Sequence, residues 1–371
     1  MRTSSTLRRS AGTVAVMATT VLGLGVLATP ADAAAPTARL RNGTVTVTGT
    51  AVRDVVDISM SHDRLRVDFG FDATIDARFS MSRVQRLSVQ LAGGNDGTAV
   101  IGTGVSDVPI TISGGGGDDG LGVLSTEDPL VAGDAPVTIA GNDGNDSLGA
   151  TVPGPATVNA GAGDDGVDGG GRAVGPETIS LGDGNDRFVS SLDSFLRHIS
   201  EVVDGGSGQD MLETRGTFAS ESLALSPSAG HLIVTHDFGD KIDADNIEDV
   251  TWTGFGGLDE TGSGDAVAVN DLTGTDVVRF APDFTDPLDN TGPNNSADTL
   301  TVRGTAGVDN ITVSSSGANI TVAGLTPLVT AVNLQTRDVL LPDVLRIDTL
   351  ASRDTVDSSG LQSGLVQLLV L

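Results

Sequence analysis

The chain repeats one hexapeptide six times: Leu91-Ala-Gly-Gly-Asn-Asp96, Gly114-Gly-Gly-Gly-Asp-Asp119, Gly141-Asn-Asp-Gly-Asn-Asp146, Ala160-Gly-Ala-Gly-Asp-Asp165, Leu181-Gly-Asp-Gly-Asn-Asp186 and Gly205-Gly-Ser-Gly-Gln-Asp210. All six segments have glycine at the fourth position and aspartate at the sixth. Glycine permits sharp turns because it adopts positive φ without a Cβ clash. We therefore expect six tight acidic loops of one design.

A short run of alternating apolar and polar residues precedes each loop, and this period of two is typical of β-strands. The runs are Leu87-x-Val89-x-Leu91, Ile110-x-Ile112, Val137-x-Ile139, Val158-x-Ala160, Ile179-x-Leu181 and, less regularly, Ile199–Val203. Two residues after four of the aspartates comes a large apolar side chain that is expected to turn inward: Leu121, Leu148, Phe188 and Leu212.

The spacing of the loops indicates how the strands stack. Successive sixth-position aspartates lie 19 to 27 residues apart, and weaker turn signals such as Pro153-Gly-Pro155 fall between them. Each repeat thus holds two strands and two turns, of which one is acidic. Such repeats stack with strands about 4.8 Å apart. The pattern predicts an all-β fold, a parallel β-roll or β-solenoid whose acidic loops form one column, flanked by β-rich modules.

A second pattern occurs outside the loops, where a Gly-Thr pair precedes two alternating apolar runs. These units open at Gly49, Gly216 and Gly304, and an Asn42-Gly43 pair predicts a hairpin before the first of them. Pro282–Ala297 is rich in Pro, Asp, Asn and Gly and is expected to be an exposed loop. The expected organisation is a signal peptide at 1–33, an N-terminal β module at 34–85, the repeat solenoid at 86–215, a second β module at 216–281, a linker at 282–298 and a C-terminal β module at 299–371.

The N-terminal segment has the features of a secretory signal peptide. Arg2, Arg8 and Arg9 form a basic region, a small and apolar run covers 11–27, and Ala31-Asp-Ala33 provides a cleavage pattern. Either general or twin-arginine export would use such a segment. We expect a secreted protein, extracellular or associated with the cell surface, with no membrane span after signal removal.

Composition narrows the possible partners. The net charge is −28, which disfavours nucleic acid and anionic membranes and favours cations. The absence of cysteine excludes disulfides and thiolate metal sites, so a bound metal is a candidate for stabilising the fold. Only four histidines and a single lysine, Lys241, are present, and no nucleophile elbow or phosphate-binding loop occurs. We therefore do not expect an enzyme.

The loops resemble the hemolysin-type calcium-binding repeats of RTX proteins, whose pattern is Gly-Gly-x-Gly-x-Asp-x-apolar-x. Gly114–Gly122 and Gly205–Glu213 match it fully, and Gly141–Gly149 matches except at Asn142. Ala160–Asp168 and Leu181–Val189 lack the first glycine, and Leu91–Ala99 is the weakest match. Family repeats recur about every nine residues, whereas these recur every twenty or so. One column of sites, with at most five gaps between six loops, is therefore expected.

The resemblance implies that Ca²⁺ lies between stacked loops, held by the sixth-position carboxylates and by loop carbonyls. The implied site residues are Asp96, Gly114, Gly115, Gly117, Asp119, Gly141, Asp143, Gly144, Asp146, Gly161, Gly163, Asp165, Gly182, Asp183, Gly184, Asp186, Gly205, Gly206, Gly208 and Asp210. Two further loop acids, Asp118 and Asp164, could assist. Such oxygen donors suit calcium, which takes six to eight oxygen ligands.

Other functions fit the sequence less well. The protein could be a calcium-dependent adhesin or surface-layer component, in which the flanking modules contact a cell-surface glycan or protein. A β-helix polysaccharide lyase or epimerase would need a basic or tyrosine catalyst, and this chain has no tyrosine. The loops could also be ordinary flexible surface turns, although six copies with common fourth and sixth positions argue against that.

Overall fold

The structure is a computed structural model that describes residues 35–371, except 128–132, 170–175, 192–199, 217–219, 237–238, 255–262, 286–295, 337–341 and 352. Residues 34–371 form one compact unit. The expected signal peptide at 1–33 lies outside the described residues. Among the residues described, no helix is both long and apolar enough to cross a membrane.

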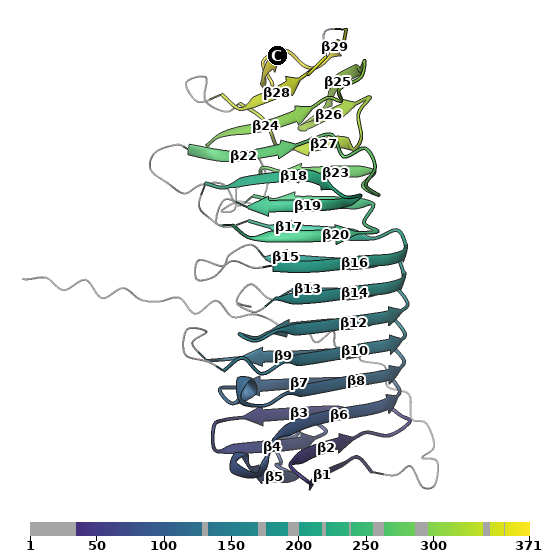
Figure 1. The fold of residues 1–371 in the computed structure, drawn as a ribbon, viewed down its shortest axis with the longest axis vertical. Helices are drawn as coiled ribbons and strands as arrows, with labels where there is room; N and C mark the ends of the chain where they lie inside the picture. The colour runs from purple at the N-terminus through teal and green to yellow at the C-terminus, as the bar shows by residue number, and fades with distance from the viewer. Residues whose placement is uncertain are drawn as a thin grey trace, which may run out of the picture. The chain divides into compact units, whose positions relative to one another are not determined.

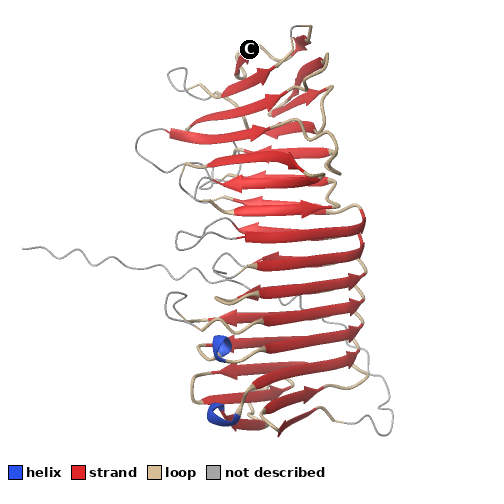
Figure 2. Cartoon of the chain, viewed as in Figure 1, coloured by secondary structure: helices blue, strands red, loops and turns tan. Residues whose placement is uncertain are grey.

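Two sheets of fifteen strands each make up this unit. Figure 2, in which strands are red, shows that the unit consists almost entirely of strands and the loops between them. Along most of the chain the strands alternate between the sheets, so that each rung contributes one strand to each (Figure 1). The first, sheet A, contains in spatial order β1 (Thr37–Arg41), β2 (Thr44–Thr48), β6 (Arg86–Gly93), β8 (Ile110–Gly116), β10 (Val137–Asp143), β12 (Ala156–Ala162), β14 (Glu177–Gly184), β16 (Ser200–Gly208), β20 (Lys241–Asp245), β19 (His231–His236), β18 (Ser222–Ser228), β22 (Ser263–Val269), β24 (Ala297–Arg303), β28 (Val344–Asp348) and β30 (Gln367–Val370).

Sheet B contains the strands on which the chain runs back after most strands of sheet A. Two short 3₁₀ helices each follow a sheet B strand in the sequence. In spatial order its strands are β29 (Thr355–Gly360), β25 (Asn310–Ser316), β26 (Asn319–Ala323), β27 (Leu328–Val332), β23 (Arg279–Asp283), β21 (Asp249–Thr253), β17 (Met211–Arg215), β15 (Arg187–Ser191), β13 (Gly166–Gly169), β11 (Ser147–Thr151), β9 (Gly120–Ser125), β7 (Gly97–Gly102), β3 (Val55–Met60), β4 (Arg64–Phe69) and β5 (Ala77–Ser80). The helices are η1 (Met81–Arg83) and η2 (Val105–Asp107).

The core lies between the two sheets. It is built from rows of apolar residues that occupy corresponding positions on successive strands of one sheet. One row in sheet A, in which each residue pairs with the next, is Val89, Ile112, Ile139, Val158, Ile179 and Val203. All six are at most 2% exposed. Burying one such side chain contributes about 1.5–3 kcal/mol, and here each contact is made with the neighbouring rung. Leu121, Leu148, Phe188 and Leu212 turn inward in sheet B, as predicted.

The three Gly-Thr units are segments of antiparallel pairing inserted into the otherwise parallel stack. They comprise β3–β4–β5, β18–β19–β20 and β25–β26–β27. The first and third belong to sheet B, whereas the second belongs to sheet A. The predicted Asn42-Gly43 hairpin is also present, since β1 and β2 pair antiparallel and both turn residues have positive φ. The all-β solenoid expected from the sequence is therefore confirmed.

Both sheets continue without a break across the expected module boundaries. Pro282 and Asp283, at the start of the expected linker, end strand β23, and Phe284 is fully buried against Trp252 with ring centroids 5.4 Å apart. Ala297 begins β24, and residues 286–295 lie outside the described part of the chain.

Candidate functional site

The six glycine-aspartate loops occur at one edge of the unit, where the chain passes from sheet A to sheet B. We call this the loop edge, and the opposite edge, where the chain passes from sheet B to sheet A, the return edge. The second loop positions stack in register as Ala92, Gly115, Asn142, Gly161, Gly182 and Gly206. The predicted single column of stacked loops is therefore present, along the right-hand side of the middle rungs in Figure 1.

Glycine is required at the fourth loop position for two separate reasons. All six fourth-position residues have φ between +116° and +153°, a region that L-residues rarely adopt. In addition, a Cβ on Gly163 would lie 2.2 Å from the carbonyl oxygen of Gly144 in the preceding rung. The same overlap recurs at Gly117, Gly144, Gly184 and Gly208. The glycines thus let successive loops approach backbone to backbone.

The sixth-position aspartates form a continuous ladder of hydrogen bonds. Each carboxylate Oδ1 accepts the backbone N–H of the corresponding aspartate in the preceding rung, at 2.7–2.9 Å. The members are Asp96, Asp119, Asp146, Asp165, Asp186 and Asp210, all 1–4% exposed. The sequence prediction that these six side chains converge on one column is confirmed.

Among the described residues, the second carboxylate oxygen, Oδ2, of each of these six aspartates has no hydrogen-bond partner, and all six of these atoms are buried. In three loops it lies over the first glycine. A Cβ on Gly114 or Gly141 would lie 2.0 Å from Oδ2 of Asp119 or Asp146, and one on Gly205 would lie 2.8 Å from Oδ2 of Asp210. A buried anionic oxygen without a partner is costly, so this column requires a neutralising group.

Burial raises the pKa of every aspartate in the column. The pKa of Asp146 rises to about 7 and the pKa values of Asp96, Asp165 and Asp210 to about 6, because desolvation outweighs the stabilising backbone N–H bond. Neighbouring carboxylates of the column add to the increase. Either protons or cations would therefore relieve the column near neutral pH.

The ladder of hydrogen bonds extends beyond the six loops at both ends. The N–H of Asp54 donates to Asp96 Oδ1 at 2.7 Å, and the N–H of Asp210 donates to Glu248 Oε2 at 2.8 Å. A separate step of the same kind joins the N–H of Asp309 to Asp354 Oδ1 at 2.9 Å. The sequence reasoning missed these four acids. Asp54, Asp309 and Asp354 could have been found, because each is the sixth residue of a hexapeptide that follows a sheet A strand.

In the Gly-Thr turns the chain itself supplies the missing partner. Asp54 Oδ2 accepts the Thr50 N–H at 2.5 Å and the Thr50 hydroxyl at 3.1 Å. Asp309 Oδ2 accepts the Thr305 N–H at 2.7 Å, and its Oδ1 accepts the Thr305 hydroxyl at 2.8 Å. Threonine occupies the second hexapeptide position in both turns, where the glycine-aspartate loops have a residue of positive φ. The two hexapeptides therefore differ in whether Oδ2 is satisfied internally.

The fifth loop positions form a second, exposed ladder that runs in the opposite sense. Here each backbone N–H donates to the side-chain oxygen of the preceding rung, at 2.8–3.2 Å. Its first five members alternate between amide and carboxylate, and the sixth is again an amide: Asn95, Asp118, Asn145, Asp164, Asn185 and Gln209. Alternation keeps like charges two rungs apart, which limits repulsion. Asp118 and Asp164 thus lie on the outer surface of the column.

The third-position acids are exposed and separate from the buried Oδ2 atoms. Asp143 and Asp183 are the two predicted site residues of this kind, and Asp183 accepts a hydrogen bond from the Ser207 hydroxyl at 2.6 Å. Within the described residues, no three His, Asp or Glu side chains form a metal cluster. A cation at this edge would therefore need backbone carbonyls as well as carboxylates, a mixture that suits calcium.

A further acidic ladder at the return edge was not anticipated. The N–H of Glu221 donates to Asp265, that of Asp265 to Asp298, and that of Asp298 to Asp343, at 2.8–3.0 Å. All four side chains are buried. Only Glu221 carries a sequence signal, since it is the sixth residue from Gly216. It lies at this edge because its turn follows a sheet B strand, β17.

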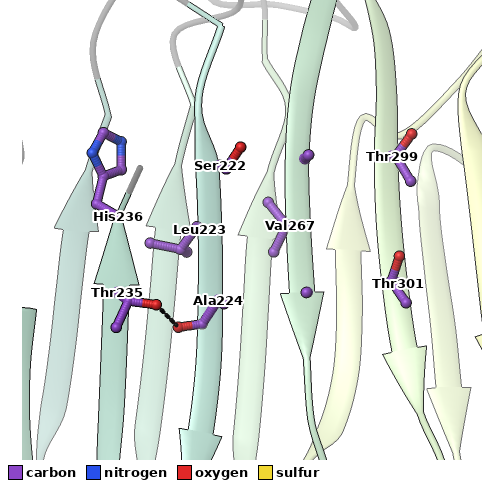
Figure 3. Close-up of a pocket in the computed structure, with 10 residues that line it drawn as sticks. Ser222, Leu223, Ala224, Thr235, His236, Val267, Thr299 and Thr301 are labelled. Carbon is purple, nitrogen blue, oxygen red and sulfur yellow. Dashed lines mark hydrogen bonds between the residues drawn. The ribbon is translucent and has the colours of Figure 1, made fainter. Parts of the chain in front are cut away.

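A shallow depression of about 300 Å³ lies on sheet A across strands β19, β18, β22 and β24 (Figure 3). Small and hydroxyl-bearing residues line it, including Ala224, whose carbonyl accepts the Thr235 hydroxyl at 3.5 Å. Among the described lining residues His236 is the single ionisable one, and its side chain is fully buried, 3.7 Å from Glu221. The described lining of the depression thus offers no exposed acid or base.

Comparison with models of known protein families and with curated protein sequences found no match.

Proposed function

We propose that this is a secreted, calcium-binding repeat protein of the hemolysin type, in which calcium occupies the column of glycine-aspartate loops and orders the solenoid. The observation that carries the proposal is the row of six buried Oδ2 atoms, for which the described part of the chain provides no hydrogen-bond partner. The Gly-Thr turns sharpen it, because there the threonine at the second hexapeptide position provides a partner for the same carboxylate oxygen.

The ligands proposed are the sixth-position carboxylates together with loop carbonyls. Calcium would neutralise adjacent carboxylates and remove their mutual repulsion, so that each ion joins two rungs. The chain's own contribution is to hold the carboxylates through the Oδ1 ladder and to bring the loops close together through the glycine stack. The role of the ion is structural, and its binding free energy adds to the stability of the folded state.

A calcium titration of the protein by calorimetry, combined with chemical unfolding, tests this function. Extracellular modules of other folds bind calcium with Kd near 10⁻⁴–10⁻³ M. At about 100 times Kd, one site stabilises the folded state by about 2.7 kcal/mol. We expect heat of binding and a rise in the unfolding midpoint in 10 mM calcium. The share of both effects that comes from the loop column would be absent if the column bound protons alone.

Asp146→Asn locates the ions within the protein. The amide oxygen can still accept the Asp119 N–H, but an NH₂ group replaces the unpartnered oxygen and cannot bind calcium. We expect fewer bound ions and a smaller calcium-induced rise in the midpoint. Asp72→Asn is the matched control, since it removes one charge from an exposed turn outside the column. An equal calcium response in Asp146→Asn and the wild type would reject the column as the site.

A further inference from the structure

Two glutamates occupy core positions that are apolar in the neighbouring rungs. In one inward-facing row of sheet A the successive residues are Leu87, Ile110, Val137, Ala156, Glu177, Glu201 and Ile242. Glu177 and Glu201 are each only 2% exposed. They lie directly opposite each other in the β14–β16 pair. Both are at the return-edge end of their strands, whereas the glycine-aspartate loops follow the other end.

The opposite sheet is adapted to these two side chains. The corresponding inward row of sheet B reads Val123, Ala150, Gly169, Ser190, Thr214 and Trp252. The residues facing the glutamates are therefore the small and polar members of an otherwise apolar row. A Cβ on Gly169 would lie 2.8 Å from the Phe188 ring and 3.2 Å from Glu177 Oε2. The lack of a side chain at Gly169 makes room for the carboxylate.

The buried charge of the pair is not compensated by the described residues. Both carboxylate oxygens of Glu177 and Oε2 of Glu201 are buried and have no hydrogen-bond partner among the residues that the structure describes. No ion pair from a described Lys, Arg or His reaches either residue. Burial and the neighbouring Glu201 raise the pKa of Glu177 well above its usual range, and burial raises the pKa of Glu201 to about 7 despite the Ser190 hydroxyl beside it. Two adjacent carboxylates in a core are strongly destabilising unless a cation or a proton neutralises them.

We propose that Glu177 and Glu201 form an internal cation site, separate from the loop column, for a divalent cation that prefers oxygen ligands. The donors are both oxygens of Glu177, Oε2 of Glu201 and the Ser190 hydroxyl, with water completing the shell. Calcium fits this donor set because it accepts bidentate carboxylates and irregular geometry. Two carboxylates balance the charge of one divalent ion. The site explains why an acidic pair replaces the apolar row at these two rungs only.

The experiment counts calcium ions bound per protein by equilibrium dialysis in three forms: wild type, Glu177→Gln/Glu201→Gln and Asp146→Asn. We expect the double variant to bind one ion fewer than the wild type. The ions lost in Asp146→Asn belong to the loop column, so the two losses are independent. If the column bound no calcium, the Glu177→Gln/Glu201→Gln variant would still bind one ion fewer than the wild type. The ion count therefore separates failure of this site from failure of the proposed function.

An unchanged calcium count in the double variant, accompanied by greater stability without calcium, overturns the proposal and shows that the pair is neutralised by protons. If the double variant does not fold, Glu177→Gln alone is measured in the same way, because it keeps Glu201. Loss of one ion in the folded single variant supports the site, and an unchanged count again overturns it.

Discussion

The glycine-aspartate loops and the Gly-Thr turns solve one structural problem in two ways. Both place an acid at the sixth position of a hexapeptide and, at the loop edge, both use that acid in the hydrogen-bond ladder between rungs. The turns then satisfy the second oxygen with threonine, as at Asp54 and Asp309. The loops have glycine or another residue of positive φ at that position and leave the second oxygen unpartnered. The difference teaches that the ladder needs only the acid, whereas the residue of positive φ at the second loop position leaves unpartnered the oxygen that a cation would use.

The largest expected effect comes from breaking the glycine stack. Gly163→Ala requires an alanine at φ +132° and places its Cβ 2.2 Å from the Gly144 carbonyl oxygen. We expect a loss of about 3–5 kcal/mol in the free energy of unfolding, measured by urea denaturation. Gly317→Ala is the control, since Gly317 also has positive φ but nothing lies within 4 Å of its added Cβ. It should cost only about 1 kcal/mol. Equal losses in the two variants would mean that backbone conformation alone, and not close stacking, requires glycine.

The pH dependence of stability without calcium should be the next largest effect. The folded state raises the pKa values of Asp96, Asp165 and Asp210 to about 6 and of Asp146 to about 7, from an ordinary value of 3.8. The folded protein therefore holds protons that the unfolded chain has already released. Stability should fall as pH rises from about 5 to 7.5, by about 1.4 kcal/mol for each carboxyl group whose folded pKa is about 6.

Unfolding curves at several pH values, with and without 10 mM calcium, measure this. Calcium should remove most of the fall, because it replaces the protons as the neutralising group. Asp146→Asn should show a shallower pH dependence than the wild type. A calcium-free stability that instead increased from pH 5 to 7.5 would contradict the buried-carboxylate account of the loops.

The smallest effect is expected in a Gly-Thr turn. Thr305→Val removes the hydroxyl that donates to Asp309 at 2.8 Å and accepts the Gly307 N–H at 3.0 Å. We expect a loss of about 1 kcal/mol, the same with and without calcium, because the partner of this carboxylate is internal. Thr312→Val, at an exposed strand position, controls for the change of side chain. A loss that calcium reversed would show that the turns bind cations as the loops do.

Much of the loop edge could be predicted from residue spacing. Glycine at the fourth position and aspartate at the sixth, after an alternating apolar run, are local features, and the structure places all six aspartates in one buried column. Asp54 and Asp354 share the hexapeptide frame but have no glycine at the fourth position, so the motif did not include them. Asp309 has Gly307 at that position but threonine at the second position, and it was not counted either. The unpartnered state of Oδ2 could not be predicted, because it depends on contacts between rungs that are 19 to 27 residues apart.

The sequence by itself determined the strands, the rungs and the single acidic column, since period-two alternation and glycine turns are properties of short segments. Only the tertiary structure decided which edge and which sheet each segment joins. The unit that opens at Gly216 resembles those at Gly49 and Gly304, yet it follows a sheet B strand and therefore carries Glu221 to the return edge. Likewise, Glu177 and Glu201 look like ordinary polar residues at strand starts, and only the register across β14 and β16 shows that they face each other inside the core. Burial of a charge depends on the neighbouring rungs, and no short stretch of sequence contains that information.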